Sequence, residues 1–141
     1  MSRIPLAMRI LVARRARNLC EYCRSAEENT GQDFFIDHVV AESRGGTGSS
    51  ENLAWCCFWC NCFKQARGKA RDPQTGDIVR LFNPRQDDWS DHFRWTRDGL
   101  TIIGQTSIGR ATVEALRLNR PNLVRGRRGW VSQGRHPPKP K

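Results

Sequence analysis

The segment FFIDHVVAESRGGTGSSENLAWCCFWCNCFKQ, residues 34–65, crowds metal-binding and proton-transferring side chains into a short length of chain. Asp37 and His38 are adjacent, a Gly-Gly pair follows at 45–46, and four cysteines lie between 56 and 62. Cysteine is also an ordinary small core residue, so the segment alone does not decide between chemistry and packing. Whether these residues serve chemistry or packing depends on which other residues the chain supplies.

A second cysteine pair precedes this segment at Cys20 and Cys23, with the same CxxC spacing as Cys57 and Cys60. A CxxC turn places two thiolates on one side of a metal, and two such turns complete a tetrahedron. The sequence therefore predicts a structural zinc ion bound by Cys20, Cys23, Cys57 and Cys60. Cys56 and Cys62 are close enough to leave open the exchange of one ligand, and the alternative is six buried core residues.

The composition favours a polyanionic partner. The chain has 141 residues, which suits one domain, with 24 Lys and Arg against 14 Asp and Glu, a net charge of +10 and a pI near 10.2. Nucleic acid is the commonest polyanion that such a field attracts, and the alternative is a merely solubilising surface. Every long apolar run is broken by Arg or Lys, which excludes a membrane span. Cysteines arranged for metal binding suggest a cytoplasmic protein.

The charges gather at the two ends of the chain. Residues 1–19 carry five arginines and no acid, and the tail from Arg125 carries four arginines, two lysines and no acid. Most of the acids lie between Glu21 and Asp98. This distribution is typical of a chain whose ends grip phosphates.

Local patterns predict the elements of the first half. Apolar spacing and Pro5 indicate a helix over 5–18, and the β-branched and aromatic residues 34–40 indicate a strand. The Gly-Gly pair indicates a loop, because glycine adopts backbone angles that other residues resist. Ser50 is a plausible N-cap, so a helix is expected from Glu51 to about Ala66.

In the second half we expect a strand over 77–83, a loop over 84–91 and a hairpin over 92–104 with Asp98-Gly99 at its turn. Thr106 is expected to cap a helix that Pro121 stops. The last seven residues, RHPPKPK, are expected to be disordered.

From Leu19 to Lys69 the chain resembles the HNH endonuclease family in its zinc-knuckle form. The shared motifs are CxxC, Asp-His on a strand, a Gly-Gly loop, Asn-Leu, and CxxC-Asn-x-x-Lys, all in the family's order. The resemblance implies a ββα-metal fold, a divalent ion and phosphodiester cleavage. We therefore expect an α+β fold, with a small ββα-metal core around a structural zinc, an N-terminal helix, and a C-terminal extension of a β-hairpin and a helix.

We expect a single domain over residues 1–141. The N-terminal helix takes 1–18, the HNH zinc core takes 19–70, the hairpin and helix extension takes 71–124, and a basic, partly disordered tail takes 125–141.

The chemistry of hydrolysis assigns roles to four residues. His38 is the expected general base, because imidazole exchanges protons readily near neutral pH. The resemblance implies that Asp37 binds the divalent ion, and Asn61 stands where the family often has a second histidine. Its hard amide oxygen suits Mg²⁺ or Mn²⁺, so Asp37 and Asn61 are the expected ligands of one such ion. Strand alternation turns Asp37 and His38 to opposite faces, which leaves their joint geometry open.

Asn52 corresponds to the family's middle asparagine, expected to hydrogen-bond loop backbone and hold the His38 strand; the alternative is an ordinary residue of a helix's first turn. Lys64 and Arg44 are candidates for phosphate contacts, and each is otherwise a solvated side chain. His92 lies among aromatic residues and is first interpreted as a half-buried structural histidine, with a role near the phosphate as the alternative.

The sequence thus favours a metal-dependent endonuclease or nickase acting on DNA, with RNA as the other candidate substrate. The alternative is a non-enzymatic zinc module that binds nucleic acid through its basic ends.

Overall fold

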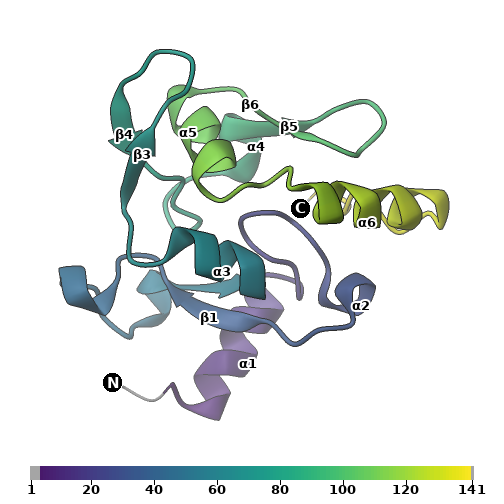
Figure 1. Cartoon of the computed structure of the whole chain (residues 1–141). Coiled ribbons are helices and arrows are strands. Elements are labelled where there is room, and N and C mark those ends of the chain that lie inside the picture. Colours follow the sequence, from purple (N-terminus) through teal and green to yellow (C-terminus); the bar gives the residue numbers. More distant parts are fainter. Residues whose placement is uncertain (1–3, 141) are drawn as a thin grey trace.

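The computed structural model describes residues 4–140, so Met1–Arg3 of the expected N-terminal region and Lys141 of the tail lie outside the described residues. Figure 1 shows two halves stacked on each other: helix α1 (Leu6–Arg15), strand β1 and helix α3 form one half, and the later elements cover it. One hydrophobic core runs through both halves, from Val12 on α1 to Leu123 in the last helix. The α+β class predicted from the sequence is confirmed.

The first half is built on an antiparallel hairpin followed by a helix. Strand β1 (Phe35–His38) pairs with strand β2 (Leu53–Cys56), with Asp37 opposite Ala54 and His38 opposite Leu53. Helix α3 (Phe58–Lys64) follows β2 after one residue and packs against β1. This strand–strand–helix order is the ββα arrangement that the resemblance to the HNH family implied.

The helix expected from Glu51 to Ala66 was wrong over its first half. Residues Ser50–Asn52 form a short 3-10 turn, η2, and residues 53–56 form β2, in which all four side chains are buried. A short apolar run with both faces buried has no periodicity that separates strand from helix. Pairing with β1 decides the outcome, and the helix begins only at Phe58, where the Cys57 sulfur accepts a hydrogen bond from the Cys60 amide.

Helix α1 packs on β2 from the other side. The Arg15 guanidinium donates to the Ser50 carbonyl at 3.0 Å and to the Leu53 carbonyl, and so fixes the start of β2. The Arg9 guanidinium lies 5.5 Å from the centre of the Trp55 ring. Two of the N-terminal arginines that were expected to grip phosphates therefore make internal contacts.

The second half consists of two small hairpins and the helices packed on them. Strands β3 (Lys69–Arg71) and β4 (Ile78–Arg80) form one antiparallel pair, and β5 (Phe93–Trp95) and β6 (Ile102–Gly104) form the other. Helix α4 (Trp89–His92) precedes β5 where the sequence predicted loop, and helix α5 (Ser107–Ala115) packs against β3, β4 and β6. The turn at Gly99, whose φ is +75°, and the cap by Thr106 are both confirmed.

The basic tail, as far as it is described, contributes a helix and two buried side chains to the second half. Helix α6 (Pro121–Ser132) runs across the expected boundary at residue 125. Its Arg127 is fully buried and donates to the carbonyls of Leu100 and Leu118. His136 is also buried, with its ring centre 4.5 Å from that of Trp95; burial, aided by the charge of Arg127, lowers the pKa of His136 to about 4.

Two further short elements complete the described chain: helix α2 (Glu27–Thr30) and the 3-10 turn η1 (Glu42–Arg44). Among the helices of residues 4–140, none combines the length and the apolar character needed to cross a lipid bilayer.

The turn between β3 and β4 depends on the Asp72 carboxylate. Its oxygens accept hydrogen bonds from Arg110 on α5 at 3.0 and 2.8 Å, from the Gln74 amide and from the Thr75 hydroxyl. The bonds from Arg110 are the main cause that holds the pKa of Asp72 well below its usual range, against the opposing effect of burial.

Because the folded pKa is depressed, the stabilisation by Asp72 is present above the unfolded pKa of about 3.9 and is lost as pH falls through the lower folded value. We predict that Asp72→Asn lowers the free energy of unfolding at pH 7, and that the gap to the parent protein narrows as the pH falls below 4. Denaturant unfolding at pH 7 and pH 3 measures this. Asp77→Asn, at an exposed carboxylate in the same turn, is the matched control, and a gap that does not depend on pH contradicts the assignment.

Candidate metal centre and active site

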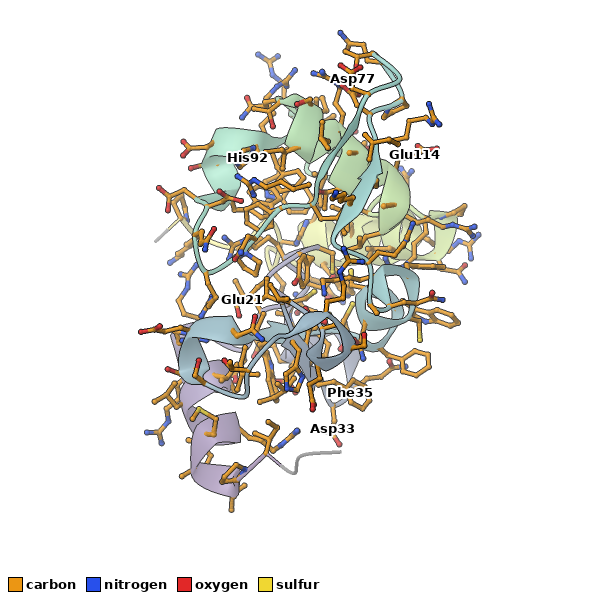
Figure 2. The ribbon with its side chains drawn as sticks, turned by 90° about the vertical axis from the view of Figure 1, so that its left-hand side faces the viewer. Glu21, Asp33, Phe35, Asp77, His92 and Glu114 are labelled. Atoms are coloured by element: carbon orange, nitrogen blue, oxygen red, sulfur yellow. The ribbon has the colours of Figure 1, made fainter. Side chains whose placement is uncertain are left out.

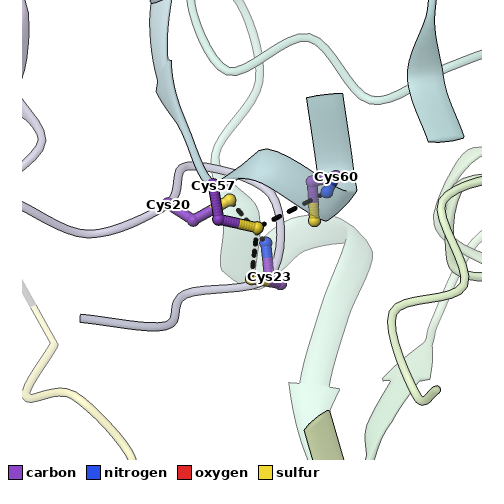
Figure 3. Close-up of side chains that lie close together, drawn as sticks. All are labelled: Cys20, Cys23, Cys57 and Cys60. Carbon is purple, nitrogen blue, oxygen red and sulfur yellow. Dashed lines mark hydrogen bonds between the residues drawn. The ribbon is translucent and has the colours of Figure 1, made fainter. Parts of the chain in front are cut away.

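Four of the six cysteines converge on one point. The sulfur atoms of Cys20, Cys23, Cys57 and Cys60 all lie within 4.8 Å of one another, and all four residues are buried (Figure 3). The first pair comes from the turn after α1 and the second from the junction of β2 and α3, as the CxxC spacing predicted. Cys56 and Cys62 lie outside the group, so the set with one exchanged ligand is not the one that forms.

The geometry of the cluster suits a tetrahedral ion. Metal–sulfur bonds of about 2.3 Å, the value for zinc, place neighbouring sulfurs of a tetrahedron roughly 3.8 Å apart. The Cys23 and Cys57 sulfurs are separated by 3.8 Å. In each pair the amide of the second cysteine points at the sulfur of the first, at 3.5 Å for Cys23 to Cys20 and 3.4 Å for Cys60 to Cys57. The donor set therefore fits a bound metal ion, and thiolates are soft ligands of the kind that zinc accepts.

Arg120, between α5 and α6, approaches the same sulfurs. Its two terminal nitrogens lie 3.8 Å from the Cys60 sulfur and 3.6 Å from the Cys57 sulfur. Although burial acts to lower it, the pKa of Arg120 is raised by the neighbouring thiolates, led by Cys60. A cluster of four thiolates around a divalent ion carries net negative charge, which this guanidinium offsets. Arg120 thus attaches the C-terminal half to the cysteine cluster.

His38 lies at the end of β1 with its side chain 19% exposed. Its Nε2 is buried and lies 3.4 Å from Glu42 Oε1, an ion-pair distance rather than a well-formed hydrogen bond. Within the described residues this nitrogen has no hydrogen bond, and the Glu42 carboxylate is the charged group beside it. Glu42 lies four residues after His38, and the sequence analysis did not identify it as a site residue.

Asp37 faces the opposite way from His38, into the core, as strand alternation requires. Its Oδ2 accepts a hydrogen bond of 2.6 Å from the buried Tyr22 hydroxyl, and its Oδ1 lies 3.2 Å from the Lys64 ammonium. Burial is the main cause that raises the pKa of Asp37, against the opposing effects of Lys64 and Tyr22. Both carboxylate oxygens therefore have partners.

Lys64 differs from both sequence-based expectations, which were a phosphate contact or a solvated side chain. It is 2% exposed, and its ammonium also donates to the His38 carbonyl at 3.1 Å. A lysine is almost never fully buried unless it is paired, and here its pairing holds α3 against β1. No local sequence pattern indicates this burial, because the partner lies 27 residues away.

Asn52 fixes the loop between the two strands. Its side-chain oxygen accepts from the Val40 amide at 2.8 Å, and its side-chain nitrogen donates to the carbonyls of Val40 and Thr47. Gly46 belongs to the same arrangement, because a Cβ at this position would stand 1.7 Å from the Val40 carbonyl oxygen. Gly45 is required for another reason: it ends η1 with φ at +91°, in the left-handed region.

Residues 20–67 match the model of the HNH endonuclease family. The match begins at Cys20, takes in the hairpin, the loop and α3, and covers about a third of the chain. It confirms the resemblance seen in the motifs, and the family implies nuclease activity on a nucleic acid. Comparisons with curated proteins and with solved structures gave no match.

Within the HNH region, Asn61 lies one turn before Lys64 on α3, and residues three apart on a helix share a face. Its amide therefore belongs to the side of the helix that packs on β1. Arg44 is exposed and lies beside Gly68, just after α3.

His92 belongs to the other half of the protein, where Figure 2 labels it on α4, well away from Phe35 on β1. Its Nδ1 lies 2.7 Å from the Thr106 hydroxyl, and its ring packs on Phe82 at a centroid distance of 5.9 Å. These are the contacts of a half-buried structural histidine.

We predict that Lys64→Met lowers the free energy of unfolding by about 3–5 kcal/mol, because it leaves the buried Asp37 carboxylate without its cation. The double variant Asp37→Asn/Lys64→Met removes both charges and is expected to recover most of that loss. Thermal and denaturant unfolding measure both. Lys69→Met, at an exposed lysine on β3, is the control, and a single variant as stable as the parent contradicts the role given to the pair.

Proposed function

We propose that this protein is a metal-dependent endonuclease or nickase that hydrolyses DNA phosphodiester bonds. The observation that carries the proposal is the HNH match over residues 20–67, which contains the adjacent Asp37 and His38 of β1. The net charge of +10 supports a polyanionic substrate.

His38 is the proposed general base. Its Nε2 faces Glu42, so we assign the ring proton to that nitrogen and leave Nδ1 to accept a proton from water. The water oxygen then bonds to phosphorus, the scissile phosphorus–oxygen bond breaks, and the leaving oxygen departs with the electron pair of that bond. Asn52 acts as a positioning residue, because it holds the loop that follows His38.

Asp37 and Asn61 are the proposed ligands of a catalytic Mg²⁺ or Mn²⁺. When bound, such an ion supplies Lewis-acid stabilisation of the charge that develops on the phosphate. The Asp37 carboxylate and the Asn61 amide are hard oxygen donors of the kind that such a cation prefers, but in this structure both Asp37 oxygens are engaged, Oδ2 by Tyr22 and Oδ1 by Lys64. Asp37 can take part only after the Lys64 ammonium has left Oδ1.

The cysteine cluster has a separate proposed role, as the site of a structural zinc ion that takes no part in the reaction. Four protein ligands leave no open position for water or substrate, which distinguishes a structural zinc site from a catalytic one.

The proposal is tested by nicking of supercoiled plasmid across a panel of divalent ions. We predict cutting with Mg²⁺ or Mn²⁺, and a fall of about 10²–10⁴-fold in His38→Ala with unchanged zinc content, since this is the usual contribution of a general base. His136→Ala, at a buried histidine on the other half, controls for loss of any histidine.

Salt-dependent DNA binding without cutting by any ion would favour the alternative, a non-enzymatic zinc module. A His38→Ala protein that cuts like the parent contradicts the role assigned to His38.

A further inference from the structure

Four aromatic side chains form a continuous row that starts at Phe35, the first residue of β1, and continues along α3. The ring centres are 6.0 Å apart for Phe35 and Phe58, 5.1 Å for Phe58 and Trp59, and 5.9 Å for Trp59 and Phe63. Phe35, Phe58 and Trp59 are 40%, 44% and 52% exposed, and Phe63 is half-buried. We refer to these four residues as the aromatic row.

The row faces outward because the inner face of α3 is already used. Cys60 belongs to the metal cluster, and Lys64 pairs with the buried Asp37, so those two positions point into the protein. Trp59 and Phe63 each precede one of these two residues, so they are four apart and share another side of the helix. Large aromatic residues normally contribute their area to a core, and a contiguous exposed group of them marks a binding surface.

Positive charge borders one end of the row. The guanidinium of Arg117 lies 5.0 Å from the centre of the Phe63 ring, and that of Arg120 lies 5.8 Å from it. Arg67 reaches the same end, where it donates to the carbonyls of Phe63 and Ala115. Arg117 and Arg67 are exposed, so their remaining N–H groups face solvent.

We propose that the aromatic row is a stacking platform for unpaired nucleobases, and that the protein engages single-stranded nucleic acid or the single-stranded part of a larger substrate there. Bases stack on the rings, and the arginines at the Phe63 end meet the phosphates. The inference deepens the proposed function and rests on it for the identity of the polymer. It names the form of substrate that the nuclease prefers.

The chemistry of the row favours an unpaired strand over a duplex. A duplex hides the faces of its bases and offers phosphates and groove edges, which call for cations and hydrogen-bonding groups rather than flat rings. An unpaired base offers a free face that stacks on any aromatic ring. A protein partner or a second copy would also cover apolar rings, but the cationic border and the net charge of +10 complement a polyanion.

The row shares both of its elements with the candidate active site. Phe35 begins β1, which ends at His38, and Phe63 is followed on α3 by Lys64, which contacts the His38 carbonyl. A nucleic-acid strand that stacks on the aromatic row is therefore held against β1 and α3, the two elements that carry His38 and Asn61.

The test is fluorescence anisotropy with a labelled oligothymidylate and with a labelled hairpin duplex, both in the His38→Ala background so that cleavage plays no part. Trp59→Ala is compared with Trp59→Phe, which retains a ring, and with Ile78→Ala, which removes an exposed apolar side chain from β4 outside the row. Zinc content and the far-ultraviolet spectrum establish that each variant is folded.

We expect Trp59→Ala to weaken binding of the single strand by about tenfold or more, as the loss of one stacked base implies, and to change duplex binding little. Trp59→Phe should retain most of the affinity, and Ile78→Ala all of it. Equal affinity of Trp59→Ala and its parent for the single strand overturns the inference. So does a self-associated parent that Trp59→Ala dissociates, which would assign the row to a second copy.

These results are independent of catalysis. A parent protein that binds single strands through Trp59 but cuts no nucleic acid with any divalent ion disproves the proposed function and leaves the binding surface in place. A parent that cuts plasmid but whose single-strand binding does not depend on Trp59 upholds the proposed function and disproves the binding surface.

Discussion

The meeting of four buried sulfur atoms is the constraint on which the rest of the structure depends. It joins the turn after α1 to the junction of β2 and α3, two segments more than thirty residues apart. In the absence of a metal, four thiols in van der Waals contact supply little cohesion, whereas thiolates around an ion supply binding free energy that becomes folding free energy. Arg120 extends the same constraint to the second half, since its guanidinium points at two of the sulfurs.

The position of α3 follows from this constraint. With Cys60 fixed at the cluster, the next turn of the helix places Lys64 beneath β1, where it pairs with Asp37 and donates to the His38 carbonyl. Cys60 and the Lys64–Asp37 ion pair occupy the inner face of the helix, and Trp59 and Phe63 lie on another side of it. The candidate active site and the aromatic row are therefore two faces of one element, each positioned by the same sulfur cluster.

Features set by local chemistry could be predicted from the sequence. The CxxC spacing identified the four clustered cysteines, Thr106 was recognised as a helix cap, and the motif order identified the HNH region. Features set by distant partners could not be predicted. Residues 53–56 form a strand because β1 pairs with them. Lys64 is buried because it forms an ion pair with the buried Asp37 carboxylate. The composition of the basic tail did not indicate the burial of Arg127 and His136 either. Arg127 donates to a backbone carbonyl of Leu118, and the His136 ring packs on Trp95.

X-ray absorption at the zinc edge of the purified protein tests most directly whether the four clustered cysteines bind a zinc ion. Mass spectrometry measures the metal content of the same sample. We expect one zinc ion per chain with four sulfur neighbours at about 2.3 Å. Cys20→Ser should lose this signal and Cys62→Ser, outside the cluster, should keep it. A well-folded protein that contains no metal, or an ion with nitrogen and oxygen neighbours in place of sulfur, would contradict the claim.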